Sequence, residues 1–199
     1  MSTDVGNDTS YTDVYCDMVT DGGGWTVLVR RLDGSVNFTK EWEDFKVGFG
    51  VLNGEFYAGN EIVHQLTVDD NRSYSLRVDL EAYDNESVFA FYTDFFIGPE
   101  SDNYRFHVHG YLSNSTAGDS LIKHDGMMFS TASHDNDIMD NVNCAALYRP
   151  WWHKHCFLSS LFGLYGEYPT IPENKGIKWE NNWGRNKFAK YATMMIRPN

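Results

Sequence analysis

A short acidic segment at residues 135–137 is the first place where this sequence could bind a metal. Asp135 and Asp137 stand two positions apart, with Asn136 between them and Asp140 close behind. Calcium takes six to eight oxygen ligands from carboxylates, carbonyls and water, at about 2.3–2.6 Å. A short turn could direct both carboxylates to one ion. A solvated acidic turn is an alternative, because Asp and Asn are common turn residues.

The spacing around this segment differs from that of an EF-hand. An EF-hand loop needs Gly at its sixth position and Glu at its twelfth, and a loop starting at Asp135 would have Asp140 and Ala146 there. The remaining ligands of a calcium ion would therefore come from backbone carbonyls. We expect Met139 and Asn141 to supply them.

Two cysteines follow the acidic segment. Cys144 and Cys156 are twelve positions apart and lack the C-x-x-C spacing of many metal sites. A disulfide that closes a loop of this size contributes on the order of 3 kcal/mol in the chain-entropy model. A zinc site with His153 and His155, or a Cys156 thiol nucleophile beside a histidine, are the alternatives. We favour the disulfide.

Composition limits the classes of partner. The 199 residues carry 16 Lys and Arg against 28 Asp and Glu, a formal charge of −12. This balance argues against nucleic acid or anionic lipid as the main partner. No apolar run approaches the roughly 20 residues that cross a bilayer. Aromatic residues make up 16% of the chain, which favours packed loops and binding surfaces as well as a core.

Glycosylation motifs predict a secreted protein. Five Asn-x-Ser/Thr motifs are present, at Asn7, Asn37, Asn71, Asn85 and Asn114. Together with the expected disulfide they favour an oxidising, extracellular compartment. Residues 1–3 are not an apolar leader, so secretion is inferred from these motifs. Cys16 is left unpaired, and we expect its partner upstream of Met1.

The chain pattern predicts an α+β fold with a central antiparallel sheet, short helices and a loop-rich C-terminal third. Thr39 is expected to cap a first helix that ends at Gly48, and Asn60 to cap a second. Residues of β-branched and aromatic type alternate in the expected strands. These strands are 14–18, 25–31, 74–81, 87–96, 104–111 and 191–196. The last one is expected to return to the main sheet, because a lone strand would leave its backbone groups unpaired.

Several motifs, in this order, resemble a fibrinogen-related domain over essentially the whole chain. They are residues 14–18 (VYCDM), 23–27 (GGWTV), 30–38 (RRLDGSVNF), 48–50 (GFG), 54–56 (GEF), 124–131 (HDGMMFST), 135–137 (DND), 143–145 (NCA), 151–152 (WW) and 194–198 (MMIRP). The resemblance implies one domain, 1–199, with subdomains 1–25, 26–118 and 119–199.

The resemblance also implies a calcium site and its neighbours. Asp135 and Asp137 match the calcium-binding carboxylates, and the carbonyls of Met139 and Asn141 are the implied further ligands. Cys144 and Cys156 match a disulfide of the family. Two departures concern the calcium segment. Ser133 stands where the family usually has Asp, and the segment between Asp137 and Cys144 is one residue longer.

In lectin members of the family, an acetylated sugar binds beside the calcium site. The matching ligand-binding residues are Tyr148, Trp151, His155, Cys156 and Phe157. The peptide that matches His155–Cys156 is often cis in those members. Phe157 replaces a histidine, which removes a polar partner for the acetyl group.

The implied function is calcium-dependent recognition of acetylated carbohydrate or microbial surface glycans by a secreted innate-immune module. The alternative is a protein–protein module, either a receptor ligand or a matrix component, with a diverged pocket. We expect no catalysis, because the candidate acid–base residues His124, His153 and His155 have packing and hydrogen bonding as their more common roles. We expect the full-length protein to form a homo-oligomer.

Overall fold

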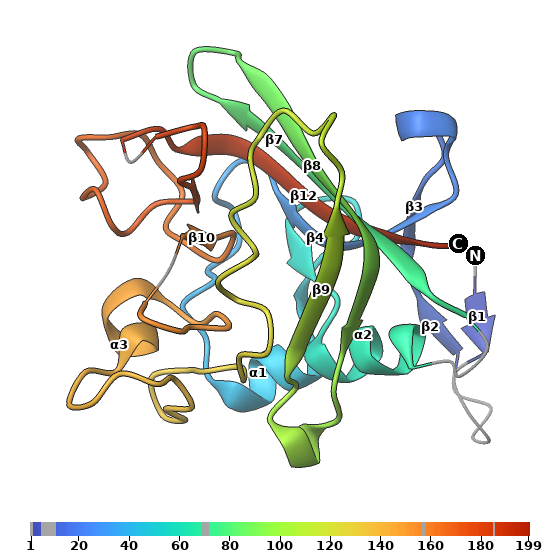
Figure 1. Ribbon diagram of the computed structural model, residues 1–199, viewed down its shortest axis with the longest axis horizontal. Helices are drawn as coiled ribbons and strands as arrows, with labels where there is room; N and C mark the ends of the chain where they lie inside the picture. Colours follow the sequence, from blue (N-terminus) through green and yellow to red (C-terminus); the bar gives the residue numbers. More distant parts are fainter. Residues whose placement is uncertain (1, 5–10, 69–71, 157, 185) are drawn as a thin grey trace.

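An antiparallel sheet runs through the middle of the molecule (Figure 1). The structure is a computed structural model and describes residues 2–4, 11–68, 72–156, 158–184 and 186–199. The strand order is β5 (Phe49–Gly50), β6 (Phe56–Tyr57), β4 (Trp25–Arg31), β12 (Ala189–Pro198), β7 (Tyr74–Ala82), β8 (Ser87–Ile97) and β9 (Phe106–Tyr111). A further strand, β3 (Tyr15–Asp17), pairs with β4. The α+β fold with a central antiparallel sheet is confirmed.

The last strand of the chain closes the sheet. β12 lies between β4 and β7, and Met194 sits opposite Val29 on one side and Val78 on the other. All three side chains are buried. The expected return of the C-terminal strand is therefore confirmed, and both of its edges are hydrogen-bonded.

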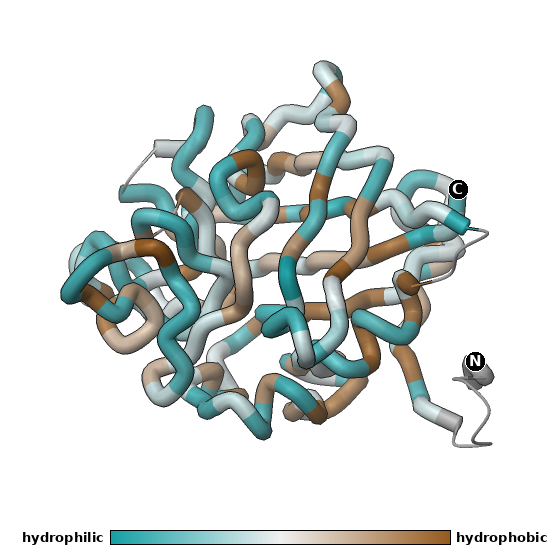
Figure 2. The backbone as a smooth tube through the Cα atoms, turned by 60° about the horizontal axis from the view of Figure 1, so that its bottom comes forward, coloured by the Kyte–Doolittle hydropathy of each residue, from teal (hydrophilic) through white to brown (hydrophobic). Residues whose placement is uncertain are grey.

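Alternation of side chains explains the longest strands. On β7, Leu76, Val78 and Leu80 are buried, whereas Arg77 and Asp79 between them are only partly buried. This period of two is the pattern of a strand whose two faces meet different surroundings. In Figure 2 hydrophobic and hydrophilic residues alternate in the same way along strands in the middle of the view.

Two short helices border the sheet, and the N-cap residue of each differs from the predicted one. Helix α1 (Trp42–Val47) has Glu41 as its N-cap, with a reciprocal capping box to Asp44, so the prediction of Thr39 as cap is wrong. Helix α2 (Asn60–Thr67) has Gly59 as N-cap. Asn60 is instead the first helical residue, and its side chain accepts a 2.5 Å hydrogen bond from the Tyr57 hydroxyl.

The C-terminal third is loop-rich, as expected. Its short elements are α3 (Cys144–Tyr148), β10 (Ser159–Ser160) and β11 (Lys178–Trp179). At the N-terminal end, β1 (Ser2–Asp4) pairs with β2 (Tyr11–Asp13). The division into subdomains 1–25, 26–118 and 119–199 stays a prediction.

Buried aromatic rings hold the C-terminal loops against α1. The ring of Phe162 lies 4.9 Å from both Phe45 of α1 and Trp151, and Phe129 lies 4.9 Å from Trp152. All five side chains are fully or almost fully buried. Rings at these separations pack favourably beyond their buried area. This cluster positions the loops that carry the candidate site.

Candidate calcium and ligand-binding site

The two predicted calcium carboxylates lie together in one loop. Asp137 accepts backbone hydrogen bonds at both oxygens, Oδ1 from Met139 (2.7 Å) and Oδ2 from Cys144 (2.8 Å). Asp135 lies next to it and accepts from the Asp137 amide at 3.4 Å. Partial burial, and then the nearby charge of Asp137, raise the pKa of Asp135. The loop therefore holds two like charges close to each other.

Helix α1 anchors this loop from the other side. The Ser133 hydroxyl donates to Glu41 Oε2 at 2.6 Å, and the ring of His134 stacks on Trp42 at 4.9 Å. Inside the loop, Asn136 donates its backbone amide to Ser130 and its side-chain amide to the Phe129 carbonyl. The carboxylates are thus carried on a loop with fixed contacts.

Carboxylate oxygens such as those of Asp135 and Asp137 are ligands of the type that calcium takes. A bound cation would favour the ionised form of Asp135, whose pKa is raised by partial burial and then by the charge of Asp137. No cluster of three or more His, Cys, Asp or Glu side chains suited to a metal is found in the described part of the chain. Carbonyl and water oxygens would have to supply the remaining ligands. Met139 and Asn141, the predicted carbonyl donors, lie in the same loop, and Asn141 has a left-handed backbone (φ 64°) that turns the chain there.

The expected disulfide is present. Cys144 and Cys156 are bonded, with their Cα atoms 5.0 Å apart. Both sulfurs are therefore occupied, and the zinc and thiol-nucleophile alternatives do not apply to this structure. Cys16 is a free, partly exposed thiol within the described residues. Its predicted pairing upstream stays a prediction.

Two buried histidines brace the loop closed by the disulfide. His153 lies with Nδ1 2.9 Å from the Cys156 carbonyl and Nε2 2.8 Å from the Arg149 carbonyl. His124 contacts the Trp152 carbonyl through Nδ1 (2.7 Å), and its Nε2 accepts from the amides of Leu158 and Ser159. Burial lowers the pKa of both rings, that of His124 to about 3. His124 is therefore neutral at physiological pH.

Tyr148 ends helix α3 and is half-buried. The Lys175 ammonium lies 5.2 Å from its ring centroid and also donates to the Leu147 carbonyl. Burial, and then the charge of Arg149, lower the pKa of Lys175. One face of the predicted sugar-stacking ring is thus occupied by a cation of this chain.

The other predicted ligand residues separate into different environments. Trp151 has no exposed surface and packs in the aromatic core, so the prediction that it contacts ligand is corrected to a supporting role. His155 is exposed and Cys156 partly exposed. The peptide between them is trans, since the cis peptide found in the described chain is Tyr168–Pro169. Phe157 lies outside the described residues.

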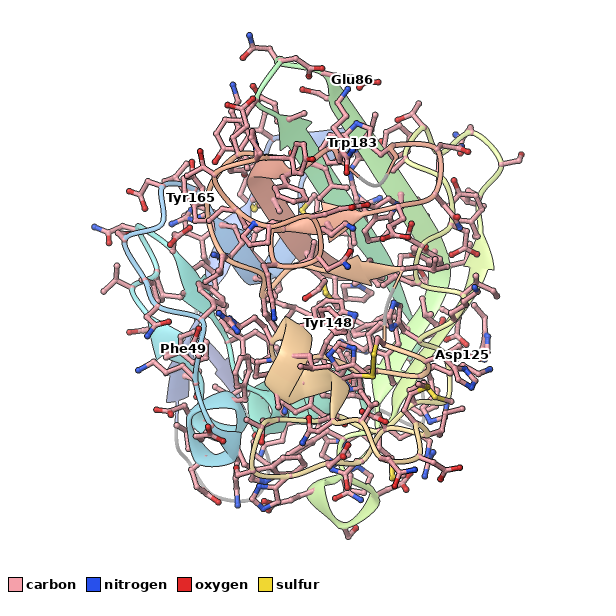
Figure 3. The ribbon with its side chains drawn as sticks, turned by 90° about the vertical axis from the view of Figure 1, so that its left-hand side faces the viewer. Phe49, Glu86, Asp125, Tyr148, Tyr165 and Trp183 are labelled. Carbon is pink, nitrogen blue, oxygen red and sulfur yellow. A yellow bond between two sulfur atoms is a disulfide. The ribbon has the colours of Figure 1, made fainter. Side chains whose placement is uncertain are left out.

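His155 and Cys156 line a cavity of about 190 Å³. Its other walls are Lys123, His124 and Lys154, and Tyr148 is not among them. Figure 3 shows the disulfide between the labelled Tyr148 and Asp125. The two lysines were missed at the sequence level because they are far apart in the chain and belong to no motif.

Fold and site together define an α+β globe whose loop-rich end is closed by a disulfide and carries a candidate ligand site. Residues 3–199 match the family described as fibrinogen beta and gamma chains, C-terminal globular domain. The chain belongs to this family.

Relatives and solved structures agree with this assignment. The chain is 46% identical to mouse (Mus musculus) fibrinogen C domain-containing protein 1 over 93% of its own length and 40% of that protein's. It is 42% identical to ryncolin-4 of Cerberus rynchops, again over 93% of its length and 53% of the relative's. The chain thus spans about two fifths to one half of these relatives.

Two solved structures share the fold. The fibrinogen-like globe domain of human ANGPTL2 has a TM-score of 0.91 at 38% identity, over all of this chain and 91% of that one. A lamprey fibrin D-dimer, solved with the peptide Gly-His-Arg-Pro-amide, has a TM-score of 0.84 at 35% identity, over 94% of this chain and 65% of that one.

Proposed function

We propose that the loop-rich end of this domain binds acetylated carbohydrate with the help of calcium, as a secreted recognition module of innate immunity. The observation that supports it is the pair Asp135 and Asp137, held in a loop beside a disulfide whose Cys156 lines a cavity. When bound, calcium would neutralise the two carboxylates and fix the loop. A relative named ryncolin adds weaker support for a lectin-like role.

The chain's own residues would then orient the sugar. His155 presents an exposed ring at the cavity, and the disulfide gives the Cys156 wall a fixed, apolar surface. Tyr148, which lies outside the walls of this cavity, would offer its ring face to the sugar in place of its contact with Lys175. The neutral, buried His124 is a structural partner of the backbone rather than an acid or base, which supports binding without catalysis.

Isothermal titration tests this function. N-acetylglucosamine should give saturable heat with calcium and none with EDTA, whereas glucosamine, which lacks the acetyl group, should not bind. Tyr148→Ala should abolish the heat, and Tyr168→Ala, an exposed tyrosine elsewhere in the loops, should not. Absence of heat at millimolar sugar would remove the acetyl-recognition proposal.

The second candidate is a protein-binding module. Lys175 covers Tyr148, and the His155–Cys156 peptide is trans, so two expected features of an acetyl pocket differ here. The related lamprey fibrin carries a peptide ligand. Binding of a protein receptor without any glycan recognition would favour this candidate.

Secretion and oligomerisation remain proposals with separate tests. Asn37, Asn85 and Asn114 are exposed, so three of the five glycosylation motifs are accessible, and Asn7 and Asn71 lie outside the described residues. No helix among the described residues is long and apolar enough to span a bilayer. Glycosidase treatment of protein from culture medium and light scattering of the full-length protein would test the two proposals.

A further inference from the structure

A cavity of about 320 Å³ lies between two loops beside the end of β4. Residues 34–39 form one wall, residues 162–165 form another, and Arg31 of β4 also lines it. In Figure 3 the labelled Tyr165 of this cavity lies well apart from Tyr148 and from the disulfide. Its volume falls within the roughly 300–1,000 Å³ of ligand-sized sites. The cavity is therefore separate from the candidate calcium and sugar site.

Hydrogen bonds and ring contacts hold the walls of this cavity in place. Glu55 is fully buried and accepts the Leu32 amide at 2.8 Å. The Tyr165 hydroxyl donates to the Leu32 carbonyl, also at 2.8 Å. The rings of Phe38 and Phe162 stack with their centroids 5.8 Å apart. The cavity is thus preformed, which spares an occupant the cost of ordering its walls.

Arg31 brings a buried cation with unused donors to the cavity. Its side chain is 2% exposed, and its Nε lies 3.5 Å from Glu55 Oε1. Nη1 donates to the carbonyls of Leu161 (2.6 Å) and Gly163 (2.8 Å). Arg31 makes no other hydrogen bond to the residues that the structure describes. Because a guanidinium has five N–H donors, Nη2 is available to an oxygen of an occupant.

The same wall contains a glycosylation acceptor. Asn37 lines the cavity and is exposed, and Phe38 and Thr39 complete its Asn-x-Thr motif. Asn37 Oδ1 accepts the Thr39 amide at 2.8 Å. This bond uses the side-chain oxygen and leaves Nδ2, the atom that carries an N-linked glycan, open to modification. The first sugar of a glycan on Asn37 would therefore start at the cavity itself.

We propose that an N-linked glycan on Asn37 is seated in this cavity, with its first N-acetylglucosamine against the Tyr165 ring and an oxygen of that sugar accepting from Arg31. The inference rests on the proposed secretion of the chain and gives one of its glycans a structural role. In the modification, Asn37 Nδ2 bonds to C1 of the sugar and loses one proton. The bond from C1 to the pyrophosphate oxygen of a lipid-linked oligosaccharide donor breaks.

The lining of the cavity and the covalent link both favour this contact. Small-molecule sites commonly combine aromatic walls with a few polar groups, and here Phe38, Phe162 and Tyr165 accompany the Arg31 guanidinium. Since the glycan is attached to the wall, its seating is intramolecular, and a short flexible link gives an effective concentration in the millimolar range. A contact too weak to hold a free sugar is then sufficient to hold the attached one.

Removal of single glycans tests the inference. The chain is secreted from cells that glycosylate, and an endoglycosidase trims every glycan to its first N-acetylglucosamine. Asn37→Gln removes the seated sugar, and Asn114→Gln is the matched control, because Asn114 is an exposed acceptor outside the cavity wall. The same proteins made without glycosylation separate the loss of the sugar from the loss of the asparagine. Mass spectrometry determines which asparagines carry a glycan.

Thermal unfolding of the trimmed proteins gives the readout. Asn37→Gln should lower Tm by about 2–4 °C, the shift that a modest stabilising contact gives in a chain of this size. Asn114→Gln should leave Tm unchanged, and so should Asn37→Gln in protein made without glycosylation. The effect of removing the Asn37 glycan should vanish in a Tyr165→Leu background. It should persist with Tyr168→Leu, which changes an exposed tyrosine outside the cavity wall.

The remaining outcomes separate this inference from the proposed secretion. An unchanged Tm in trimmed Asn37→Gln overturns the seating of the glycan. A Tm difference that persists in Tyr165→Leu, or in protein made without glycosylation, overturns it as well. Glycans on Asn85 or Asn114 with none on Asn37 overturn the inference and leave secretion standing. Absence of every glycan overturns the inference and removes the glycosylation motifs as support for secretion.

Discussion

Partial burial, and then the nearby charge of Asp137, raise the pKa of Asp135 in the folded protein. Ionisation of Asp135 therefore costs the folded state more than the unfolded chain. Without calcium, the free energy of unfolding should fall as the pH rises from 3.8 through the raised pKa of Asp135. A bound cation reverses the effect, because it favours both ionised carboxylates.

Asp135→Asn should therefore preserve or raise the stability without calcium and remove the stabilisation by calcium. With EDTA at neutral pH, the variant should be at least as stable as the wild type. Calcium should raise the melting temperature of the wild type by the amount expected from ligand linkage, about 2.7 kcal/mol at a concentration 100-fold above Kd, and should not raise that of the variant. Asp140→Asn, in the same loop, is the control. An equal calcium response in Asp135→Asn would contradict the predicted ligand set.

The contribution of His124 to stability should change with pH in the opposite direction to that of Asp135. Its folded pKa is about 3, against 6.5 in the unfolded chain, so the folded protein binds this proton more weakly. The stabilisation is complete above pH 6.5 and is lost as the pH falls towards 3, at up to about 1.4 kcal/mol per unit. The lowered pKa of buried His153 acts in the same direction.

Urea unfolding at pH 7.5 and pH 5.0 measures this effect. Wild-type stability should fall by about 2 kcal/mol between the two values from His124 alone. His124→Gln should be less stable at pH 7.5, because it disturbs buried backbone contacts, and its loss on acidification should be smaller. Parallel losses in the two proteins would show that His124 does not titrate with a lowered pKa.

At the scale of elements, α1 couples the sheet side of the molecule to the acidic loop. Glu41 caps the helix and also accepts the Ser133 hydroxyl. Glu41→Ala should therefore lower stability by about 1 kcal/mol through the lost cap and also weaken calcium binding. Glu43→Ala, an exposed carboxylate in the first turn of the same helix, should leave calcium affinity unchanged. Equal calcium affinity in both variants would disprove the coupling.

The disulfide joins α3 to the cavity wall. Cys144→Ser with Cys156→Ser should reduce the free energy of unfolding by about 3 kcal/mol, because the unfolded chain loses a closed loop. Denaturant unfolding with and without reductant measures this. A reductant effect in the double variant would implicate Cys16 instead.

Local pattern was sufficient for the regular elements. Alternation located β4 at its observed bounds and β7, β8 and β12 to within two residues at either end. Helix α1 was misplaced at its start, because the capping box of Glu41 and Asp44 satisfies its first turn better than Thr39 does. Motifs also placed the acidic loop and the disulfide.

The site was less accessible to sequence reasoning, because it depends on contacts between distant segments. Lys123 and Lys154 come together only through the fold around buried His124, which bonds to residues 28 to 35 positions away. Trp151 matched a ligand residue by motif, yet its apolar ring is worth more in the core than at the surface. Sequence periodicity predicts neither the shared cavity of Lys123 and Lys154 nor the burial of Trp151.

For the whole molecule, the proposed ligand recognition is located at the loop-rich end. The loop-rich end carries Asp135 and Asp137 together in one loop, and it also carries a cavity lined by His155 and Cys156. Another cavity, of about 340 Å³, lies on the sheet beside Arg77, Asp79 and Tyr191. This cavity is the alternative binding site to the loop-rich end.

The most direct test is a map of amide chemical shifts in the calcium-loaded domain as N-acetylglucosamine is added. We expect saturable shifts confined to the loop-rich end, around Tyr148, His155 and Cys156. Shifts centred on Arg77 and Tyr191, or no shifts at millimolar sugar, would contradict it.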